Sequence, residues 1–215
     1  MIKAVIFDFD DTLAQTWKQK WAHHKYTAKD SYGVELTDEK LAEHWGEPFN
    51  TMVGNLYGHP DTEENMIAEN RKSEAEFKKL LMPGADSAIR ELKSAGVQLG
   101  IITSLSTDFV LQDLDMLAFS RADFFYIAGA DQTEFHKPDP RVFGEVLATL
   151  EKEGIEKTEI AYVGDSTLDC KAALGAGIHH VAITTGRDTK GDLEAAGATV
   201  IIEDISELPT VIAAR

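Results

Sequence analysis

Acidic side chains follow the first apolar run of the sequence. In AVIFDFDDTL, residues 4–13, Asp8, Asp10 and Asp11 stand at the end of what reads as a buried strand. If the chain stays extended, Asp8 and Asp10 project to one side, while Phe9 and Asp11 point away. Two carboxylates so close repel each other unless a cation or a proton lies between them. Alternatively the acids only form a turn, in which Asp is common.

Polar residues also follow two later apolar runs. Thr103 and Ser104 end one run, Asp165 ends another with Asp169 four residues on, and Lys137 precedes a predicted helix. The carboxyl ends of parallel strands meet at one edge of a sheet, so these groups are expected to converge there. A carboxylate can attack phosphorus to form an aspartyl-phosphate, and oxygen ligands suit magnesium. A lysine can neutralise the transferring group, and a second acid can protonate the leaving alcohol and then activate water.

The elements that must position these residues are short apolar strands. Five runs rich in Val and Ile and a less apolar sixth predict strands at 3–9, 97–103, 159–165, 179–185, 198–202 and 123–129. The runs are near-continuous, which is typical of parallel strands buried on both faces. Helical patterns over 84–96, 141–154 and 167–177 alternate with them. We therefore expect an α/β fold with a doubly wound, mostly parallel sheet.

The stretch after the first strand has a different character. It is polar, carries several aromatic residues and contains no strand-like run, whereas 38–45 and 62–81 read as helices. This predicts an α-helical domain inserted into the chain. The expected division is a Rossmann-like catalytic core over 1–14 and 82–215, and a helical cap over 15–81.

The order of these motifs resembles the haloacid dehalogenase-like hydrolases, in the branch that includes phosphoglycolate phosphatase. The resemblance covers essentially the whole chain. Its four motifs are Asp8-Phe9-Asp10-Asp11-Thr12, then Thr103, then Lys137-Pro138, then Gly164-Asp165-Ser166-Thr167-Leu168-Asp169. Each motif alone is weak, but four in order at matching strand ends are specific.

The resemblance implies roles for the core residues. Asp8 would be the nucleophile and a magnesium ligand. Asp10 would be the general acid/base and would offer its backbone carbonyl to the metal, and Asp165 would complete the metal site. Thr103 would bind the transferring phosphoryl group together with Lys137, which would also steady Asp8.

Further positions follow from the same resemblance. Thr12 and Ser104 would line the phosphate pocket. Asp169 would bind the metal directly or through water, or would support the metal ligands without binding the metal itself. Ser166 would have the same supporting role.

In the cap, Lys20 on the first helix is a candidate substrate contact, and residues 44–50 resemble the family's specificity loop by position. The adjacent His23 and His24 form a poor metal-ligand pair, because neighbouring helical residues diverge by about 100°.

The identities of residues 10 and 12 distinguish among the reactions that members of this family catalyse. Dehalogenase relatives lack the second acid, and phosphonatase relatives replace it with a small residue. Sugar phosphomutases keep both acids but commonly have Val in place of Thr12 and a cap histidine where this chain has Lys20. A phosphatase is favoured, with phosphoglycolate as one substrate guess. The alternatives are a sugar phosphomutase and a catalytically idle regulatory protein, although the nucleophile, acid and lysine are all retained.

Composition limits the partners. The 215 residues carry a net charge of -16, which disfavours binding to nucleic acid because polyanions repel each other. The single cysteine, Cys170, fits a reducing compartment. No apolar run approaches the roughly 18 residues of a membrane span, and no signal peptide is apparent. We expect a cytoplasmic monomer or homodimer that acts on a small phosphorylated metabolite.

Overall fold

The chain forms two units. The computed structural model describes residues 1–45 and 49–215, and its contacts divide the chain into Met1–Gln15 with Leu80–Arg215 and, separately, Thr16–Lys79. The boundaries expected from the sequence lie within two residues of these. The assignment of the two units as catalytic core and cap stays a prediction.

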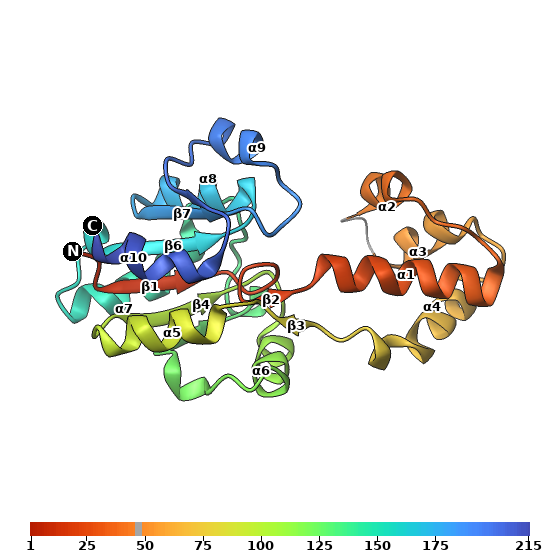
Figure 1. The fold of residues 1–215 in the computed structure, drawn as a ribbon, viewed down its shortest axis with the longest axis horizontal. Coiled ribbons are helices and arrows are strands. Elements are labelled where there is room, and N and C mark those ends of the chain that lie inside the picture. Colours follow the sequence, from red (N-terminus) through yellow and green to blue (C-terminus); the bar gives the residue numbers. More distant parts are fainter. Residues whose placement is uncertain (46–48) are drawn as a thin grey trace. The chain divides into compact units, whose positions relative to one another are not determined.

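The larger unit is built on a six-stranded parallel sheet with the strand order β5-β4-β1-β6-β7-β8 (Figure 1). All six predicted strands are present, so the expected fold class is confirmed. The strands are β1 (Ala4–Phe7), β4 (Gln98–Ile102), β5 (Tyr126–Ala128), β6 (Ile160–Gly164), β7 (His179–Ile183) and β8 (Ile201–Ile202).

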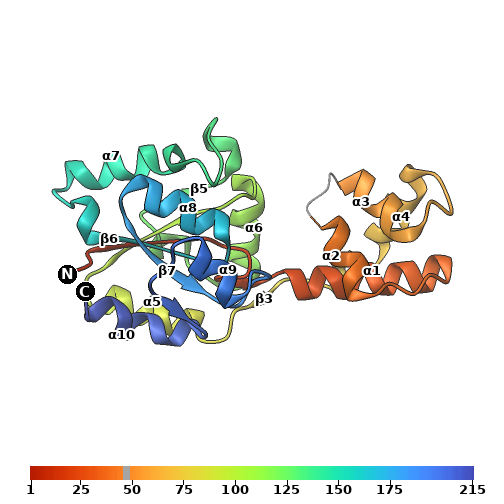
Figure 2. The ribbon, with the colours of Figure 1, turned by 90° about the horizontal axis from the view of Figure 1, so that it is seen from above.

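Helices cover both faces of this sheet (Figure 2). On one face α5 and α10 lie side by side, and on the other lie α7 and α8. The helices of this unit are α5 (Ala85–Ser94), α6 (Thr107–Met116), α7 (Gly144–Lys152), α8 (Thr167–Ala176), α9 (Lys190–Ala195) and α10 (Leu208–Ala213). Strand β1 alternates between the two faces: Val5 and Phe7 enter one core, and Ala4 and Ile6 enter the other. Burial on both faces explains the near-continuous apolar runs.

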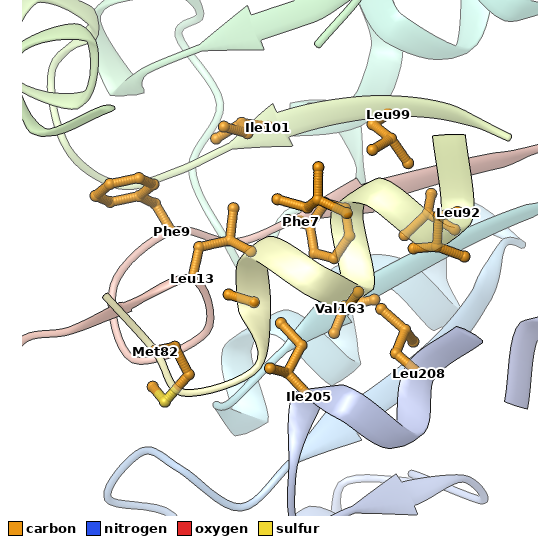
Figure 3. Close-up of a cluster of buried hydrophobic side chains, with 14 of the residues drawn as sticks. Phe7, Phe9, Leu13, Met82, Leu92, Leu99, Ile101, Val163, Ile205 and Leu208 are labelled. Carbon is orange, nitrogen blue, oxygen red and sulfur yellow. The ribbon is translucent and has the colours of Figure 1, made fainter. Parts of the chain in front are cut away.

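The apolar core continues beyond the end of β1 (Figure 3). Phe9 and Leu13 are fully buried against the same cluster as Phe7. The backbone N–H of Leu13 donates to the carbonyl oxygen of Phe9 at 2.9 Å, which closes a turn in which Asp11 has a φ of 57°. The turn that carries the acidic residues is thus anchored by apolar side chains on both sides.

A short antiparallel ladder joins β2 (Ala14–Gln15) to β3 (Leu80–Leu81). The side-chain amide of Gln15 also donates to the carbonyl oxygen of Leu81 at 3.1 Å. The predicted helix over 62–81 was wrong in its second half, because α4 ends at Lys72 and a 3-10 turn follows at Glu74–Glu76. The partners of residues 80–81 lie far away in the sequence, so local periodicity could not reveal the pairing.

The smaller unit contains four helices among its described residues: α1 (Trp17–Tyr32), α2 (Asp38–His44), α3 (Phe49–Tyr57) and α4 (Glu63–Lys72). Thr37 and Thr62 cap α2 and α4, each accepting a hydrogen bond from a backbone N–H three residues on. Trp21, Leu41 and Met66 belong to its core. The predicted specificity loop, 44–50, includes residues 46–48, which lie outside the described residues.

Two buried histidines belong to a polar network inside the smaller unit. Nε2 of His23 lies 2.7 Å from the carbonyl oxygen of Asn70, and Nδ1 of His24 lies 3.1 Å from the hydroxyl of Tyr57. The side-chain amide of Asn70 donates to the same hydroxyl at 2.8 Å. Both histidine rings therefore have hydrogen-bond partners within the smaller unit, which is consistent with a structural role.

This network predicts a loss of stability in acid. Burial lowers the pKa of His24 to about 4, whereas an unfolded chain protonates histidine near pH 6.5. As pH falls through that window, the unfolded state takes up a proton that the folded state refuses, so stability decreases by about 2 kcal/mol at about pH 5. Burial also lowers the pKa of His23, which adds to the same trend.

Tryptophan fluorescence can report this unfolding, because all three tryptophans, Trp17, Trp21 and Trp45, lie in the smaller unit. Urea unfolding followed at pH 8 and pH 5 is expected to show a weaker pH dependence in His24→Gln than in the wild type. His44→Gln, on α2 of the same unit, should retain the wild-type dependence. Equal pH dependence in His24→Gln and the wild type would contradict the assignment.

Candidate active site

Asp8 lies at the carboxyl end of β1, at the centre of the sheet. Its backbone N–H donates to the carbonyl oxygen of Val163 in β6 at 2.8 Å, and its side chain is buried. The strand order reverses beside β1, since β4 and β5 lie on one side and β6, β7 and β8 on the other. Open parallel sheets bind ligands at this kind of position.

Three carboxylates gather at this edge. One oxygen each of Asp8, Asp165 and Asp169 lies within 4.8 Å of the other two. Asp165 directly follows β6, and Asp169 lies in the first turn of α8. The structure thus brings together Asp8 and Asp165, two of the predicted metal ligands, with Asp169, which was predicted to bind the metal or to support the site. The side chain of Asp10 is not part of this cluster, and its predicted contact is through the backbone carbonyl.

Lys137 brings a buried positive charge into the site. Its side chain is buried, and its Nζ lies 2.9 Å from Oδ1 of Asp8 and 2.6 Å from Oδ1 of Asp169. The residue follows β5 and precedes the 3-10 turn Pro140–Phe143. The sequence-based expectation that this lysine lies against Asp8 agrees with its position.

Tyr162, in the middle of β6, was not singled out from the sequence. Its fully buried hydroxyl lies 3.2 Å from Nζ of Lys137 and 3.1 Å from both Oδ1 of Asp169 and the carbonyl oxygen of Ile102. One sequence signal could have pointed to it. A tyrosine within an otherwise apolar buried strand requires a partner for its hydroxyl.

Burial and charge oppose each other in this cluster. Burial raises the pKa of Asp8 to about 7, although Lys137 acts to lower it. Burial, Asp8 and Asp169 hold the pKa of Asp165 well above its usual range. For Asp169, Lys137 and hydrogen bonds from Ser166 outweigh burial and lower the pKa. Asp169 and Asp8 raise the pKa of Lys137 despite its burial. Burial thus disfavours the charged forms of Asp8 and Asp165, and an additional cation would stabilise them.

Ser166 orients Asp169. The side-chain oxygen of Ser166 accepts from the backbone N–H of Asp169 at 3.2 Å, and Oδ2 of Asp169 accepts from the backbone N–H of Ser166 at 3.0 Å. This reciprocal capping box begins α8. A Cβ at Gly164 would lie 2.5 Å from Cγ of Asp169, so only glycine leaves room for that carboxylate.

The loop after β7 packs closely against Asp165 and is hydrogen-bonded to the turn after β1. A Cβ at Gly186 would lie only 1.8 Å from Oδ2 of Asp165. The hydroxyl of Thr185 donates to the carbonyl oxygen of Asp11, and Oδ2 of Asp188 accepts from the backbone N–H that begins α8 at 2.6 Å. Local sequence patterns do not reveal these contacts, because they join segments far apart in the chain.

The expected alternation of side chains over residues 8–11 holds only in part. Strand β1 ends at Phe7, and Asp11 adopts a left-handed conformation. The charge of Asp11 is one of those that raise the pKa of Asp165, so Asp11 contributes to the electrostatics of the carboxylate cluster. The alternation fails at Asp11 because the strand has already ended and the chain turns there.

The predicted phosphate-binding hydroxyls follow two adjacent strands, Thr12 after β1 and Thr103 and Ser104 after β4. Thr103 directly follows β4, the strand beside β1, and its Oγ1 accepts from the backbone N–H of Leu105 at 3.3 Å. Ser104 is exposed. Thr12 is fully buried, and its Oγ1 has no hydrogen-bond partner among the described residues. In the smaller unit, Nζ of Lys20 lies 3.4 Å from a carboxylate oxygen of Glu74. The roles of Lys20 and of the three hydroxyl residues stay predictions.

The comparison with protein families identifies the class. Residues 5–183 match the model of the haloacid dehalogenase-like hydrolases, so the chain belongs to this family. The resemblance inferred from the four motifs is confirmed, and so is the expected enzyme class, a hydrolase. No helix among the described residues is long and apolar enough to cross a membrane.

Individual relatives agree with this classification. A Clostridium perfringens protein assigned as the pyrophosphatase PpaX is 31% identical over 181 residues, which are 82% of this chain and 81% of that protein. Phosphoglycolate phosphatase of Pseudomonas putida is 30% identical over 129 residues, 60% of this chain and 46% of that protein. The fold matches a Thermotoga maritima structure assigned as a beta-phosphoglucomutase, with a TM-score of 0.83, 24% identity and 99% of each chain covered. This last similarity concerns the fold alone.

Proposed function

We propose that this hydrolase is a magnesium-dependent phosphatase that acts on a small phosphomonoester through an aspartyl-phosphate on Asp8. The observation that carries the proposal is the buried contact between Nζ of Lys137 and Oδ1 of Asp8, 2.9 Å long, beside a cluster of three carboxylates. This arrangement provides a nucleophile, a fixed positive charge and oxygen ligands within one small volume.

The carboxylates fit a divalent cation. Oxygens of Asp8, Asp165 and Asp169 approach within 4.8 Å of one another, and hard cations such as Mg²⁺ prefer oxygen ligands. Asp8 and Asp165 would bind the ion with the backbone carbonyl of Asp10, and Asp169 would bind or support it. When bound, Mg²⁺ supplies positive charge that offsets the charge of the carboxylates and of the substrate's phosphoryl oxygens.

In the first step, a carboxylate oxygen of Asp8 attacks phosphorus, and the bond between phosphorus and the leaving oxygen breaks. Asp10 gives its proton to the leaving oxygen, so that an alcohol departs. Lys137 holds Asp8 in place and, with Thr103, Thr12 and Ser104 as expected partners, neutralises and orients the phosphoryl oxygens.

In the second step, Asp10 takes a proton from a water molecule. The water oxygen attacks phosphorus, and the bond between phosphorus and Asp8 breaks. Inorganic phosphate leaves, Asp8 returns as a carboxylate, and Asp10 is protonated for the next cycle. The balance is one phosphomonoester and one water converted to one alcohol and one phosphate.

The substrate is proposed as a small phosphorylated metabolite, with phosphoglycolate as the first compound to test. Pyrophosphate is a second compound, because the Clostridium perfringens relative carries that assignment. Lys20 is proposed to affect substrate choice. A cytoplasmic location and a monomeric or dimeric state stay predictions from the sequence.

A panel of phosphate compounds tests the function. Phosphate release is measured with phosphoglycolate, pyrophosphate, sugar phosphates and a chromogenic phosphomonoester, each with Mg²⁺ and with a chelator. We expect Mg²⁺-dependent release, with one compound far ahead. The absence of release from every compound would contradict the proposal. Conversion of a sugar 1-phosphate to the 6-phosphate without release would instead favour the phosphomutase alternative.

Substitution of Gly186 is expected to weaken the binding of the cation. In Gly186→Ala the new Cβ displaces the Asp165 carboxylate from its position. Loss of the surroundings that orient a metal ligand typically lowers metal affinity by about ten-fold or more. Free Mn²⁺ measured by electron paramagnetic resonance gives the affinity directly. Gly191→Ala is the control, since its Cβ meets only the Thr189 hydroxyl oxygen, at 3.8 Å. Equal affinities in the two folded variants would refute the role of Gly186.

A further inference from the structure

We infer that Tyr162 is a positioning residue that holds the ammonium group of Lys137 against Asp8. The inference rests on the proposed function, because it concerns the geometry of the same site. Four motifs define the expected active site, and this tyrosine lies outside the roles assigned to them. Its hydroxyl nevertheless makes polar contacts within the site itself.

The hydroxyl of Tyr162 stands between three polar groups. Nζ of Lys137 donates to it at 3.2 Å. Its own single proton can go to the carbonyl oxygen of Ile102 or to Oδ1 of Asp169, each 3.1 Å away. The Tyr162 hydroxyl therefore accepts one hydrogen bond from the Lys137 ammonium group and donates one to an oxygen. These two hydrogen bonds use its single proton and one of its lone pairs.

The contact with Ile102 spans the sheet. Tyr162 belongs to β6 and Ile102 to β4, and β1 lies between these strands. The side chain therefore crosses β1 on the face that also carries Ile6, its register partner, and its hydroxyl reaches the end of β4. Ile102 directly precedes Thr103. One side chain thus links the two strands that flank the strand leading to Asp8.

The ring of Tyr162 has little freedom to move. It is fully buried. The ring of Phe143 contacts it edge-on, with 4.8 Å between ring centroids, and the ring of His180 stacks beside it, with 6.3 Å between ring centroids. Both ring nitrogens of His180 are buried with no hydrogen-bond partner among the described residues, so that ring packs as an apolar surface. A ring fixed in this way gives its hydroxyl a defined position.

The ammonium group of Lys137 has three N–H donors, and the structure provides three acceptors: Asp8, Asp169 and Tyr162. Without the hydroxyl, one buried N–H loses its acceptor. The ammonium can then shift toward Asp169, its shortest partner at 2.6 Å, and away from Asp8 at 2.9 Å. The attacking carboxylate would be less well held, which affects the chemical step more than substrate binding.

Tyr162→Phe tests this role, because it removes one oxygen and keeps the ring. We expect kcat to fall by about ten-fold, while KM changes by less than about two-fold. Tyr126→Phe is the matched control, since Tyr126 lies in β5 of the same sheet and donates its hydroxyl proton to Glu145 at 3.2 Å. Its kcat is expected to equal that of the wild type. Equal kcat values in Tyr162→Phe and Tyr126→Phe would overturn the inference.

A second measurement is independent of turnover. The ¹⁵N–¹H signal of the Lys137 ammonium group, identified by its loss in Lys137→Met, is expected to shift in Tyr162→Phe and to stay unchanged in Tyr126→Phe. An unchanged signal in Tyr162→Phe would overturn the inference even if the enzyme is active. A shifted signal in a protein that releases no phosphate would support the contact and refute the proposed function, so the two failures are distinguishable.

Discussion

Asp8→Asn is expected to reduce phosphate release by about 10⁴-fold or more, because an amide cannot act as the nucleophile that forms the acyl-phosphate. The substitution keeps the size of the side chain and one of its oxygens. It also removes one buried negative charge from a cluster whose carboxylates repel each other, and Lys137 keeps its shorter contact with Asp169. We therefore expect an unfolding midpoint close to that of the wild type, and the loss of activity reports chemistry rather than folding.

Phosphate release and thermal unfolding are measured on the same samples. Asp108→Asn, an exposed position in the first turn of α6, makes the same chemical change away from the site and should retain full activity. Turnover in Asp8→Asn equal to that of the wild type would exclude Asp8 as the nucleophile.

Lys137→Met is expected to impair both catalysis and stability. The apolar side chain fills a similar volume but leaves Asp8 and Asp169 buried without their cation. Removal of one preorganised hydrogen-bond donor typically costs about 10²- to 10³-fold in kcat. Removal of one partner from a buried ion pair also destabilises a protein by about 3 kcal/mol. Added Mg²⁺ is expected to restore part of the stability, since a ligand that binds only the folded state favours folding.

The measurements are kcat and the free energy of unfolding in urea, with and without Mg²⁺. Lys93→Met is the control, because Lys93 forms an exposed ion pair with Asp123, and exposed pairs contribute about 1 kcal/mol or less. If Lys137→Met were as active and as stable as Lys93→Met, the buried lysine would have no role in the site.

The strands and the motif residues at their ends could be predicted, because both are local signals. An apolar run such as 160–164 indicates a buried strand without knowledge of its neighbours, and a polar residue that follows it lies at the carboxyl edge of a parallel sheet. Asp8, Asp165, Asp169 and Lys137 were all found in this way or through the family motifs, and the structure brings them together.

Two features were missed because they depend on contacts between distant segments. Leu80 and Leu81 carry a helical pattern but pair with Ala14 and Gln15. The importance of Gly186 is apparent only when the Asp165 carboxylate lies against it. These relationships depend on tertiary packing, which a single sequence does not encode in its local periodicity.

The most direct test of the central claim is to trap the phosphorylated form of Asp8. Borohydride reduces an acyl-phosphate of aspartate to homoserine, which peptide mass spectrometry locates in the sequence. With substrate and Mg²⁺, we predict homoserine at position 8, and we predict none with a chelator or in Asp8→Asn. Phosphate release by the wild type with an unreduced Asp8, or with homoserine at another aspartate, would contradict the account.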